Sequence, residues 1–518
     1  MKNPLMSVPG PPSTSWWKGN FSQVFDRING WEFHRELRER YGGVVKLNML
    51  FGDKQLYVTD PLSLDHIIHK DQDIFEETSF FVTSNNLFLG KSLLSTLGEQ
   101  HRKQRRILNP VFSQRNMHAL LPILYPIAHQ LREILLSKLR NGEEMINVMN
   151  WISRAALESI AQGGLGYSLD AFDENKKNAY SDAIKMLAPL NAKLFLYRQF
   201  LPYAVKFGPP TFRRKLLELL PFKSVKKMIY ISDTVAYSAS AVLQNKRKDL
   251  EAEKLIAGQD ERSSDILQAI LKANVRALGD DRMHDSEILG HMSAFLVAGH
   301  ETTTSAICRI LHQLALNPHV QSRLREEVSL ARMEHGDLDF NTLMNLPFLD
   351  AVCRETLRLF PPVPQLSRTT KEDVVLPLLW PIKAADGKDE IKEIYLRKNT
   401  NVIISIIGIN RDKRVWGDDA EEWKPERWIK TSAEAVSRVH IPGIYSSTLT
   451  FLGGARSCIG FKFAEMEIKL VLSVLLEKLQ FSPGPDILWT MNFLQTPIVK
   501  ESGDINTQQL PLKISFAV

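Results

Sequence analysis

Apolar residues recur at three- and four-residue steps through most of residues 62–359, and this spacing predicts helices. Two short runs rich in Val, Leu and Tyr around a Gly-Asp turn, within residues 42–61, predict a pair of strands. Proline-rich and strand-like pieces at residues 361–383 predict a second small sheet. The clearest helical runs cover residues 98–108, 125–139, 148–163, 174–187 and 223–250. The pattern therefore predicts a mainly α protein with small β-sheets.

The longest helical pattern covers residues 285–318 and is apolar on nearly every face. It begins at an Asp or Ser that can cap a helix, and it ends at an Asn-Pro pair. A helix that is apolar all round is buried in a large protein or in a membrane, and the charges within this one disfavour the membrane. We therefore expect it to pass through the middle of the protein.

The first 20 residues contain the sequence LMSVPGPPSTSW, which is typical of a proline-rich hinge. We predict that residues 1–20 form this hinge and that residues 21–518 form a single domain. No stretch of about 20 apolar residues and no signal peptide is evident. Because hinges connect two parts, the segment raises the hypothesis of a membrane anchor before it.

Composition narrows the class of protein further. Hydrophobic residues make up 44% and charged residues 24%, which is ordinary for a folded globular protein. The formal net charge of +6 is too small for this length to indicate a nucleic-acid partner. Cys308, Cys353 and Cys458 are spaced too widely for a disulfide framework or a paired-cysteine zinc site, which favours a reducing, cytosol-facing environment.

Cys458 stands between glycines and two residues after Arg456. A single thiolate that binds a metal needs other ligands from outside the protein, and haem supplies four ring nitrogens. Glycines at 453, 454 and 460 would let the backbone turn sharply beside a flat macrocycle, and Arg456 could pair with a haem propionate. The alternative interpretation is a buried cysteine in a glycine turn.

The arrangement Phe451-x-x-Gly454-x-Arg456-x-Cys458-x-Gly460 closely resembles the haem-binding signature of the cytochrome P450 family. The resemblance extends over most of the chain. It implies the cytochrome P450 fold, in which haem b (iron protoporphyrin IX) lies between a long central helix and the cysteine loop. It also implies that Cys458 is the axial ligand of the iron and that Phe451, Arg456 and Gly460 bind the cofactor.

A second motif, Ala-Gly-His-Glu-Thr-Thr at residues 298–303, lies within the long central helix. Gly299 costs about 1 kcal/mol relative to Ala in a helix interior, and space for a small ligand would compensate. The motif resembles the oxygen-activation motif of the family, which assigns proton delivery to Glu301 and Thr302 as catalytic residues. The alternative is that Gly and Thr only pack here. His300 occupies the variable position and is not expected to bind iron.

Glu355 and Arg358 are an acid and a base one turn apart, which on most helices indicates a solvated face. Their position before two prolines, and well before the sequence Pro-Glu-Arg-Trp at residues 425–428, resembles the structural triad of the family. The resemblance implies that Arg427 completes a buried network with them. We therefore assign all three to folding and not to chemistry.

Three further residues are predicted to contact the haem propionates by resemblance. His101 stands where the family usually has tryptophan, Arg105 matches the arginine of the same helix, and Arg368 occupies the other propionate-pairing position. The departure at His101 keeps a hydrogen-bond donor. A solvated helix histidine and an ordinary edge-strand arginine are the alternatives for His101 and Arg368.

The resemblance implies a haem-thiolate monooxygenase that uses O2 to oxidise a lipophilic small molecule. Similarity of residues 411–428 to the fungal membrane-bound branch favours secondary metabolism, such as terpenoid biosynthesis. A non-catalytic haem carrier or gas sensor, an oxygen-independent rearrangement of a peroxide, and a fatty acid or xenobiotic hydroxylase remain alternatives. The expected pocket walls are residues 80–94, Phe295, Ala298, residues 363–366 and residues 494–496, which are mostly apolar.

No glycine-rich dinucleotide fingerprint is evident, so electrons are expected from an NADPH-cytochrome reductase. Its docking face is predicted from Arg102, Lys103, Arg106, Lys462 and Lys469, with a solvated basic face as the alternative. Residues 188–222 combine apolar, aromatic and basic side chains and predict a lid in peripheral contact with a membrane, or two core-facing helices with a proline loop. We expect the protein to be located at the cytosolic face of the endoplasmic reticulum membrane.

Overall fold

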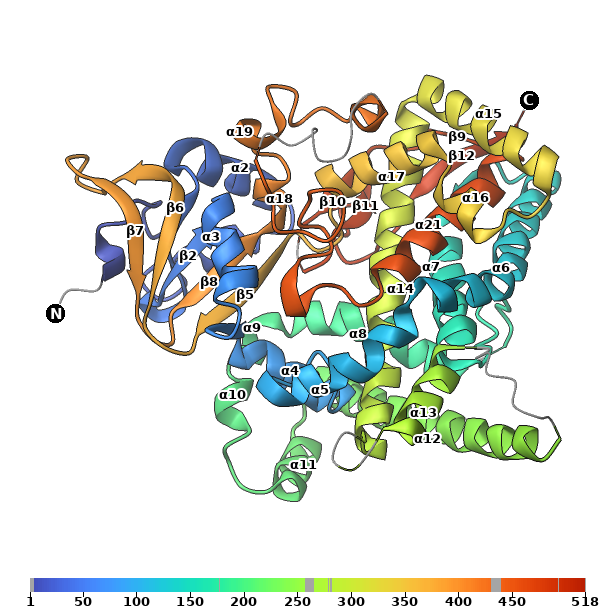
Figure 1. The fold of residues 1–518 in the computed structure, drawn as a ribbon, viewed down its shortest axis with the longest axis horizontal. Helices are drawn as coiled ribbons and strands as arrows, with labels where there is room; N and C mark the ends of the chain where they lie inside the picture. The colour runs from blue at the N-terminus through green and yellow to red at the C-terminus, as the bar shows by residue number, and fades with distance from the viewer. Residues whose placement is uncertain are drawn as a thin grey trace.

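The computed structural model of the chain describes residues 4–176, 178–256, 265–277, 279, 282–429, 439–491 and 493–517. Helices form the larger part of the molecule, and most of the strands gather at one end of it (Figure 1). The long helix α14, Asp285–Leu316, passes through the middle of the helical part. The prediction of a mainly α fold with small sheets is therefore confirmed.

The largest sheet has five strands in the order β1-β2-β8-β5-β3. Its strands are β1 (Val44–Asn48), β2 (Lys54–Val58), β3 (Phe75–Glu77), β5 (Gln365–Thr370) and β8 (Asn401–Ser405). Strands β2 and β8 are parallel, and the other neighbours are antiparallel. The predicted strand pair within residues 42–61 is confirmed as β1 and β2. The strand-like pieces after residue 361 are also confirmed: β5 joins the first sheet, whereas β6 (Val374–Lys383) belongs to a second small sheet, as predicted.

Three smaller sheets lie outside the five-stranded sheet. A long hairpin is made by β6 (Val374–Lys383) and β7 (Glu390–Leu396). The other two sheets have the orders β4-β12-β9 and β10-β11. Their strands are β4 (Met145–Asn147), β9 (Leu479–Ser482), β10 (Ile487–Thr490), β11 (Thr496–Val499) and β12 (Pro511–Phe516). Strands β4 and β12 are hydrogen-bonded to each other although they lie far apart in the sequence. The C-terminal end of the chain is therefore bound to the helical part of the molecule.

Each predicted helical run is present as a helix, and some of these helices begin or end at residues other than those predicted. The helix predicted at residues 98–108 has those bounds, whereas α6 begins well before residue 125 because Pro122 and Pro126 are accommodated inside it. The helices are α1 (Phe21–Val24), α2 (Gly30–Tyr41), α3 (Pro61–Asp65), α4 (Ser79–Leu89), α5 (Gly98–Leu108), α6 (Gln114–Arg140), α7 (Val148–Ser159), α8 (Ala179–Lys193), α9 (Phe195–Arg198), α10 (Leu201–Ala204), α11 (Pro210–Leu219), α12 (Lys223–Ile256), α13 (Ile266–Arg276), α14, α15 (Pro318–His335), α16 (Phe340–Met344), α17 (Pro347–Leu359), α18 (Ile406–Ile409), α19 (Lys413–Trp416) and α21 (Phe461–Leu476).

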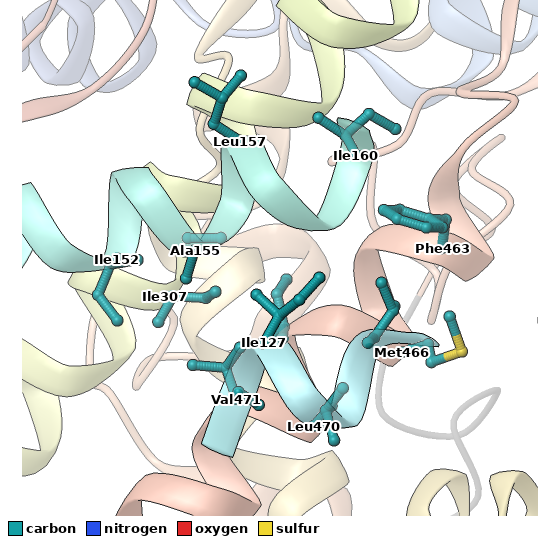
Figure 2. Close-up of a cluster of buried hydrophobic side chains, with 14 of the residues drawn as sticks. Ile127, Ile152, Ala155, Leu157, Ile160, Ile307, Phe463, Met466, Leu470 and Val471 are labelled. Atoms are coloured by element: carbon teal, nitrogen blue, oxygen red, sulfur yellow. The ribbon is translucent and has the colours of Figure 1, made fainter. Parts of the chain in front are cut away.

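The core of the helical part lies where α6, α7, α14 and α21 pack together (Figure 2). Ile127 of α6, Ile152 of α7, Ile307 of α14 and Leu470 of α21 are all buried in this cluster. Helix α14 is capped by His284 and Glu287 in a capping box, so the cap is not the predicted Asp285 or Ser286. The packing fixes the central helix and α21, which follows the cysteine loop.

The predicted triad of Glu355, Arg358 and Arg427 forms one buried network. Arg358 donates to both carboxylate oxygens of Glu355, at 2.8 and 2.9 Å, and both side chains are 0% exposed. Arg427 lies 3.4 Å from the same carboxylate, and Trp428 donates to it at 2.9 Å. The alternative of a solvated helix face is therefore wrong for Glu355 and Arg358.

The segment predicted as a hinge is packed against the sheet end of the molecule where the structure describes it. Leu5 and Val8 are buried in the cluster that covers the β6–β7 hairpin. The backbone N–H of Lys46 donates to the carbonyl of Pro9 at 2.8 Å. Residues 4–9 are thus held against the domain by apolar burial and by backbone hydrogen bonds.

Among the described residues, no helix is both long enough and apolar enough to cross a bilayer.

Candidate active site

A cavity of about 1090 Å³ lies between the central helix α14 and the loop that carries Cys458. Its size exceeds the range of about 300 to 1,000 Å³ that is usual for small-molecule sites. Phe80, Phe295 and Ala298 line it as predicted, together with Val363 and other predicted wall residues. The cavity therefore has room for a large apolar ligand beside a second bound group.

The prediction was wrong for residues 494–496, which are not on the cavity wall among the described residues. Gln495 instead holds two other elements together, because it accepts a hydrogen bond from Ser305 and its backbone donates to Pro362. Aromatic residues that sequence reasoning missed take part in the wall, namely Phe21, Phe25, Phe195 and Phe493. Their rings contact one another around Phe195, with centroids 4.3 to 5.5 Å from it.

Cys458 lies on the cavity wall with part of its surface exposed, and that surface faces the cavity. Its backbone N–H donates to the carbonyl of Phe451 at 2.9 Å, which closes the loop around the thiol. Burial raises the pKa of the Cys458 thiol, while a hydrogen bond from the Gly460 backbone and the charge of Arg105 act in the opposite direction. A nearby cation would therefore be needed to hold this sulfur as a thiolate.

Two of the three glycines of the cysteine loop have a further reason that the sequence did not predict. A Cβ on Gly453 would lie 1.9 Å from the carbonyl oxygen of Pro442, and one on Gly454 would lie 2.1 Å from that of Ile68. Gly454 also has a φ of +62°, which favours glycine. These two glycines are required by close packing of the backbone, whereas Gly460 lines the cavity and has open space where a Cβ would be.

Basic residues gather on one part of the cavity wall. Arg368 pairs with Glu77 at 2.9 Å and Arg456 pairs with Glu76 at 2.9 Å. Arg105 donates to the carbonyl of Ser457 at 2.9 Å and has no carboxylate partner among the described residues. Burial lowers the pKa of Arg105, but an arginine stays charged, so this cation lacks an anion. Arg368 is buried on β5 between β8 and β3, so the alternative of an edge-strand arginine is wrong.

His101 lies on the same part of the wall, on α5, and is 5% exposed. The alternative of a solvated histidine is therefore wrong. Burial, followed by the charges of Arg456, Arg105 and Arg368, lowers the pKa of His101 to about 3. The imidazole is neutral at physiological pH, and it can donate one hydrogen bond without adding charge.

Residues of α14 also line the cavity. Thr302 lines the cavity, and its hydroxyl donates to the carbonyl of Ala298 at 2.6 Å. Glu301 is next to it on the helix and lies off the wall, where burial raises the pKa of its carboxyl to about 7. A Cβ on Gly299 would lie 2.9 Å from Ile160, so packing as well as cavity space requires this glycine. His300 is buried, bonds to Ser153 at 2.8 Å and does not line the cavity.

These residues fit a haem. A thiol that faces the cavity can bind iron, and Arg105 is a cavity cation without a carboxylate partner, as a propionate would require. The open space at Gly460 leaves room for a flat ring against the loop. A cavity with a cysteine thiol on one wall and a long central helix on the other is typical of a haem–thiolate protein.

Comparison with known proteins gives the family. The model of the cytochrome P450 family matches residues 9–499. The chain is 44% identical to cytochrome P450 monooxygenase 91 of Postia placenta, over 99% of this chain and 94% of the relative. It is 35% identical to the ganoderic acid synthetase CYP5150L8 of Ganoderma lucidum and 34% identical to the cytochrome P450 monooxygenase eriI of Hericium erinaceus, over at least 99% of this chain and 94% of each relative. The chain therefore belongs to the cytochrome P450 family and is a monooxygenase, as the sequence motifs predict.

Membership of the family implies a haem–thiolate cofactor, O2 and a reductase partner in general terms. It leaves the carrier, gas-sensor and peroxide-rearrangement alternatives without support, because the relatives are named as monooxygenases.

Proposed function

We propose that this monooxygenase oxidises a lipophilic small molecule of fungal secondary metabolism, and that the molecule is a terpenoid. The observation that carries the proposal is the large cavity, whose wall is mostly apolar and includes the thiol of Cys458. A relative named for the synthesis of ganoderic acid supports a natural-product substrate. A fatty acid or xenobiotic hydroxylase is the second candidate, and an apolar cavity suits it as well.

Haem b, when bound, supplies the redox chemistry that activates O2. The residues of the chain would bind and orient the haem. Cys458 would be the iron ligand, and the haem propionates would lie among Arg105, Arg368, Arg456 and His101. Phe451 and Gly460 would lie against the cofactor. Thr302 holds a hydroxyl on the cavity wall, from which a proton can be donated at the reaction site. The neighbouring Glu301 keeps its proton up to about pH 7 but lies off the wall, so its carboxyl would have to turn toward the cavity to resupply that proton.

The substrate proposal is tested by expressing the chain with a fungal cytochrome reductase in yeast and feeding sesquiterpenes, triterpenes, fatty acids and aromatic xenobiotics. We expect an oxygenated product from a terpene, identified by mass spectrometry and absent from cells with the reductase alone. Products from fatty acids or xenobiotics only would replace the terpenoid proposal by the second candidate.

Replacing Thr302 by alanine is expected to leave haem binding unchanged and to lower the product formed per NADPH consumed about tenfold or more. The reason is that the cavity loses a hydroxyl beside the reacting oxygen. Product, NADPH and hydrogen peroxide are measured in the reconstituted system. Thr304→Ala is the matched control, because the Thr304 hydroxyl, two residues further along α14, makes the same kind of bond to the carbonyl of His300 at 2.7 Å and lies off the cavity wall. Equal coupling in both variants would show that Thr302 only packs.

The docking face for the reductase needs one correction. Lys469 is 1% exposed and pairs with Asp350 and Glu465, so it cannot contact a partner. Arg102 and Arg106 are exposed on α5, and Lys103 and Lys462 are partly exposed. We propose an acidic NADPH-cytochrome reductase that docks on this remaining basic face.

Reversing the charge at Lys103 and Lys462 to glutamate is expected to slow reduction about tenfold at low salt, because opposite charges steer the encounter. Stopped-flow reduction across a range of salt concentrations measures the effect, and substrate affinity should not change. The control reverses Lys388 and Lys392, which are exposed on or beside β7 at the far end of the molecule (Figure 1). The same salt dependence in all three proteins would contradict the docking face.

Residues 195–222, here called the apolar arm, contain α9, α10 and α11, of which α10 and α11 lie at the edge of the molecule (Figure 1). Tyr203, Phe207 and Phe212 are 68%, 76% and 55% exposed, and Leu219 is exposed as well. The alternative of core-facing helices is therefore wrong for α10 and α11, whereas Phe195 of α9 is buried on the cavity wall. Such a large exposed apolar patch beside basic residues favours a membrane surface, and we propose peripheral contact with the cytosolic face of the endoplasmic reticulum.

Replacing Phe207 and Phe212 by serine is expected to reduce co-flotation with vesicles of phosphatidylcholine and phosphatidylserine at least about tenfold, because both rings lose contact with the lipid. The matched control replaces Leu330 and Met333, which are 55% and 82% exposed on α15 at the opposite end. Equal flotation of the two variants would exclude the apolar arm as the contact.

A further inference from the structure

Most polar side chains on the cavity wall already have a partner inside the protein. Asn85 donates to the carbonyl of Phe81 at 2.9 Å, and Asn401 accepts a hydrogen bond from Thr369 at 2.5 Å. Gln55 donates to Asp53 at 2.8 Å, and Glu77 pairs with Arg368. These groups are satisfied and do not require a ligand.

Three polar residues of the wall, among those that the structure describes, have buried side-chain atoms without a hydrogen-bond partner. Both ring nitrogens of His291, the hydroxyl of Thr303 and the Oε1 atom of Gln365 are buried without a hydrogen-bond partner. A buried polar group without a partner is costly, and a native protein keeps one where a ligand, an ion or water satisfies it. These atoms therefore indicate where the contents of the cavity are polar.

His291 and Gln365 come from separate parts of the fold. His291 lies on the same face of α14 as Thr302, about three turns or 16 Å before it along the helix axis. Its ring is fully buried and lies nearly parallel to that of Phe295, with centroids 5.8 Å apart. Gln365 begins β5, three residues before Arg368. The two side chains thus mark the wall at two positions, on a helix and on a strand.

The charge around these two positions is also informative. Burial lowers the pKa of His291 to about 4, and the charge of Glu287 opposes this only partly, so the imidazole is neutral. The Gln365 amide is neutral at every pH. Neutral donors and acceptors match a hydroxyl or a carbonyl better than a carboxylate, which needs a cation. The cations of the wall, Arg105, Arg368 and Arg456, are assigned to the haem under the proposed function.

We propose that His291 and Gln365 are hydrogen-bonding residues for the substrate, which is a lipophilic molecule that carries a neutral oxygen function, a hydroxyl or a carbonyl. The proposal rests on the proposed function and narrows its substrate class. It excludes a plain hydrocarbon and a fatty acid as the preferred substrate. It also implies that an earlier oxygenating or hydrating reaction supplies the molecule.

The test compares four ligands with one carbon skeleton: androstane, its 3-alcohol, its 3-ketone and its 3-carboxylic acid. Equilibrium dialysis against the haem-loaded protein measures each Kd. We expect the alcohol or the ketone to bind the wild type about tenfold more tightly than the hydrocarbon and the acid. Gln365→Leu and His291→Phe should each lose most of this preference without weakening hydrocarbon binding.

Gln199→Leu is the matched control, because Gln199 lines the cavity on the partly exposed apolar arm, where water can satisfy it. It should keep the preference. The thermal midpoint of the ligand-free Gln365→Leu protein should not fall, since an unpaired polar group is replaced by an apolar one of similar shape.

Equal binding of the four ligands, failure of all four to bind, an unchanged preference in both variants, or a large loss of stability in Gln365→Leu would each overturn the proposal. A missing thiolate-type spectrum in the wild type would instead contradict the assignment of the haem. The two failures are therefore distinguishable.

Discussion

Replacing Cys458 by serine is expected to abolish the thiolate-type absorption band of the reduced carbon-monoxide complex and to remove monooxygenase activity. Cys458 is the one cysteine among the described residues of the cavity wall. A serine oxygen does not donate electrons to iron as a thiolate does. Difference spectra of the purified variant measure the band, and haem content is determined separately.

The other two cysteines provide the matched control. Cys308 lies on α14 and Cys353 lies on α17, and both are buried away from the cavity wall. Cys308→Ser and Cys353→Ser should keep the band in whatever fraction of the protein folds. Persistence of the band in Cys458→Ser would refute the assignment of the ligand.

Replacing Arg358 by methionine is expected to lower the free energy of unfolding by about 3 to 5 kcal/mol, which is the usual cost of removing one partner of a buried ion pair. The carboxylate of Glu355 would stay buried with Arg427 as its remaining cationic partner. The carbonyls of Asn410 and Ala420, which accept hydrogen bonds from Arg358 at 2.8 and 2.6 Å, would lose their donor. We expect little folded, haem-loaded protein at 37 °C.

Arg35→Met is the control for this prediction, because Arg35 and Glu32 have the same one-turn spacing on α2 and lie 2.6 Å apart. That pair is exposed to solvent, so its loss should change stability by no more than about 0.5 kcal/mol. Thermal and urea unfolding compare the two variants. A similar small effect at both positions would show that the buried network does not stabilise the fold.

The periodic pattern predicted elements whose ends are fixed by local signals. Helix α5 begins at Gly98 and α12 begins at Lys223, as predicted. The pattern failed where a local rule was overridden. Two prolines inside α6 disguised its first turns, and Asn178 caps the backbone N–H groups of Tyr180 and Ser181, so α8 begins later than predicted.

The motifs located one end of the candidate site because chemistry constrains the residues there. Cys458, Arg105, Arg368 and Thr302 all lie on the cavity wall. The distal walls were harder to predict, because apolar residues such as Phe195 and Phe493 look like ordinary core residues in a sequence. His291 and Gln365 belong to no motif. Their lack of a hydrogen-bond partner can be seen only in the folded structure.

The contacts of Gly453 and Gly454 have a consequence for how this chain can change over evolutionary time. Any side chain at either position would collide with the backbone at Pro442 or at Ile68. A lineage that lost Gly454 would therefore have to move the distant backbone at Ile68 at the same time. We therefore expect residues 66–70 and the cysteine loop to change together among related chains. The family signature thus reflects the close packing of two stretches of backbone as well as the preference of iron for sulfur.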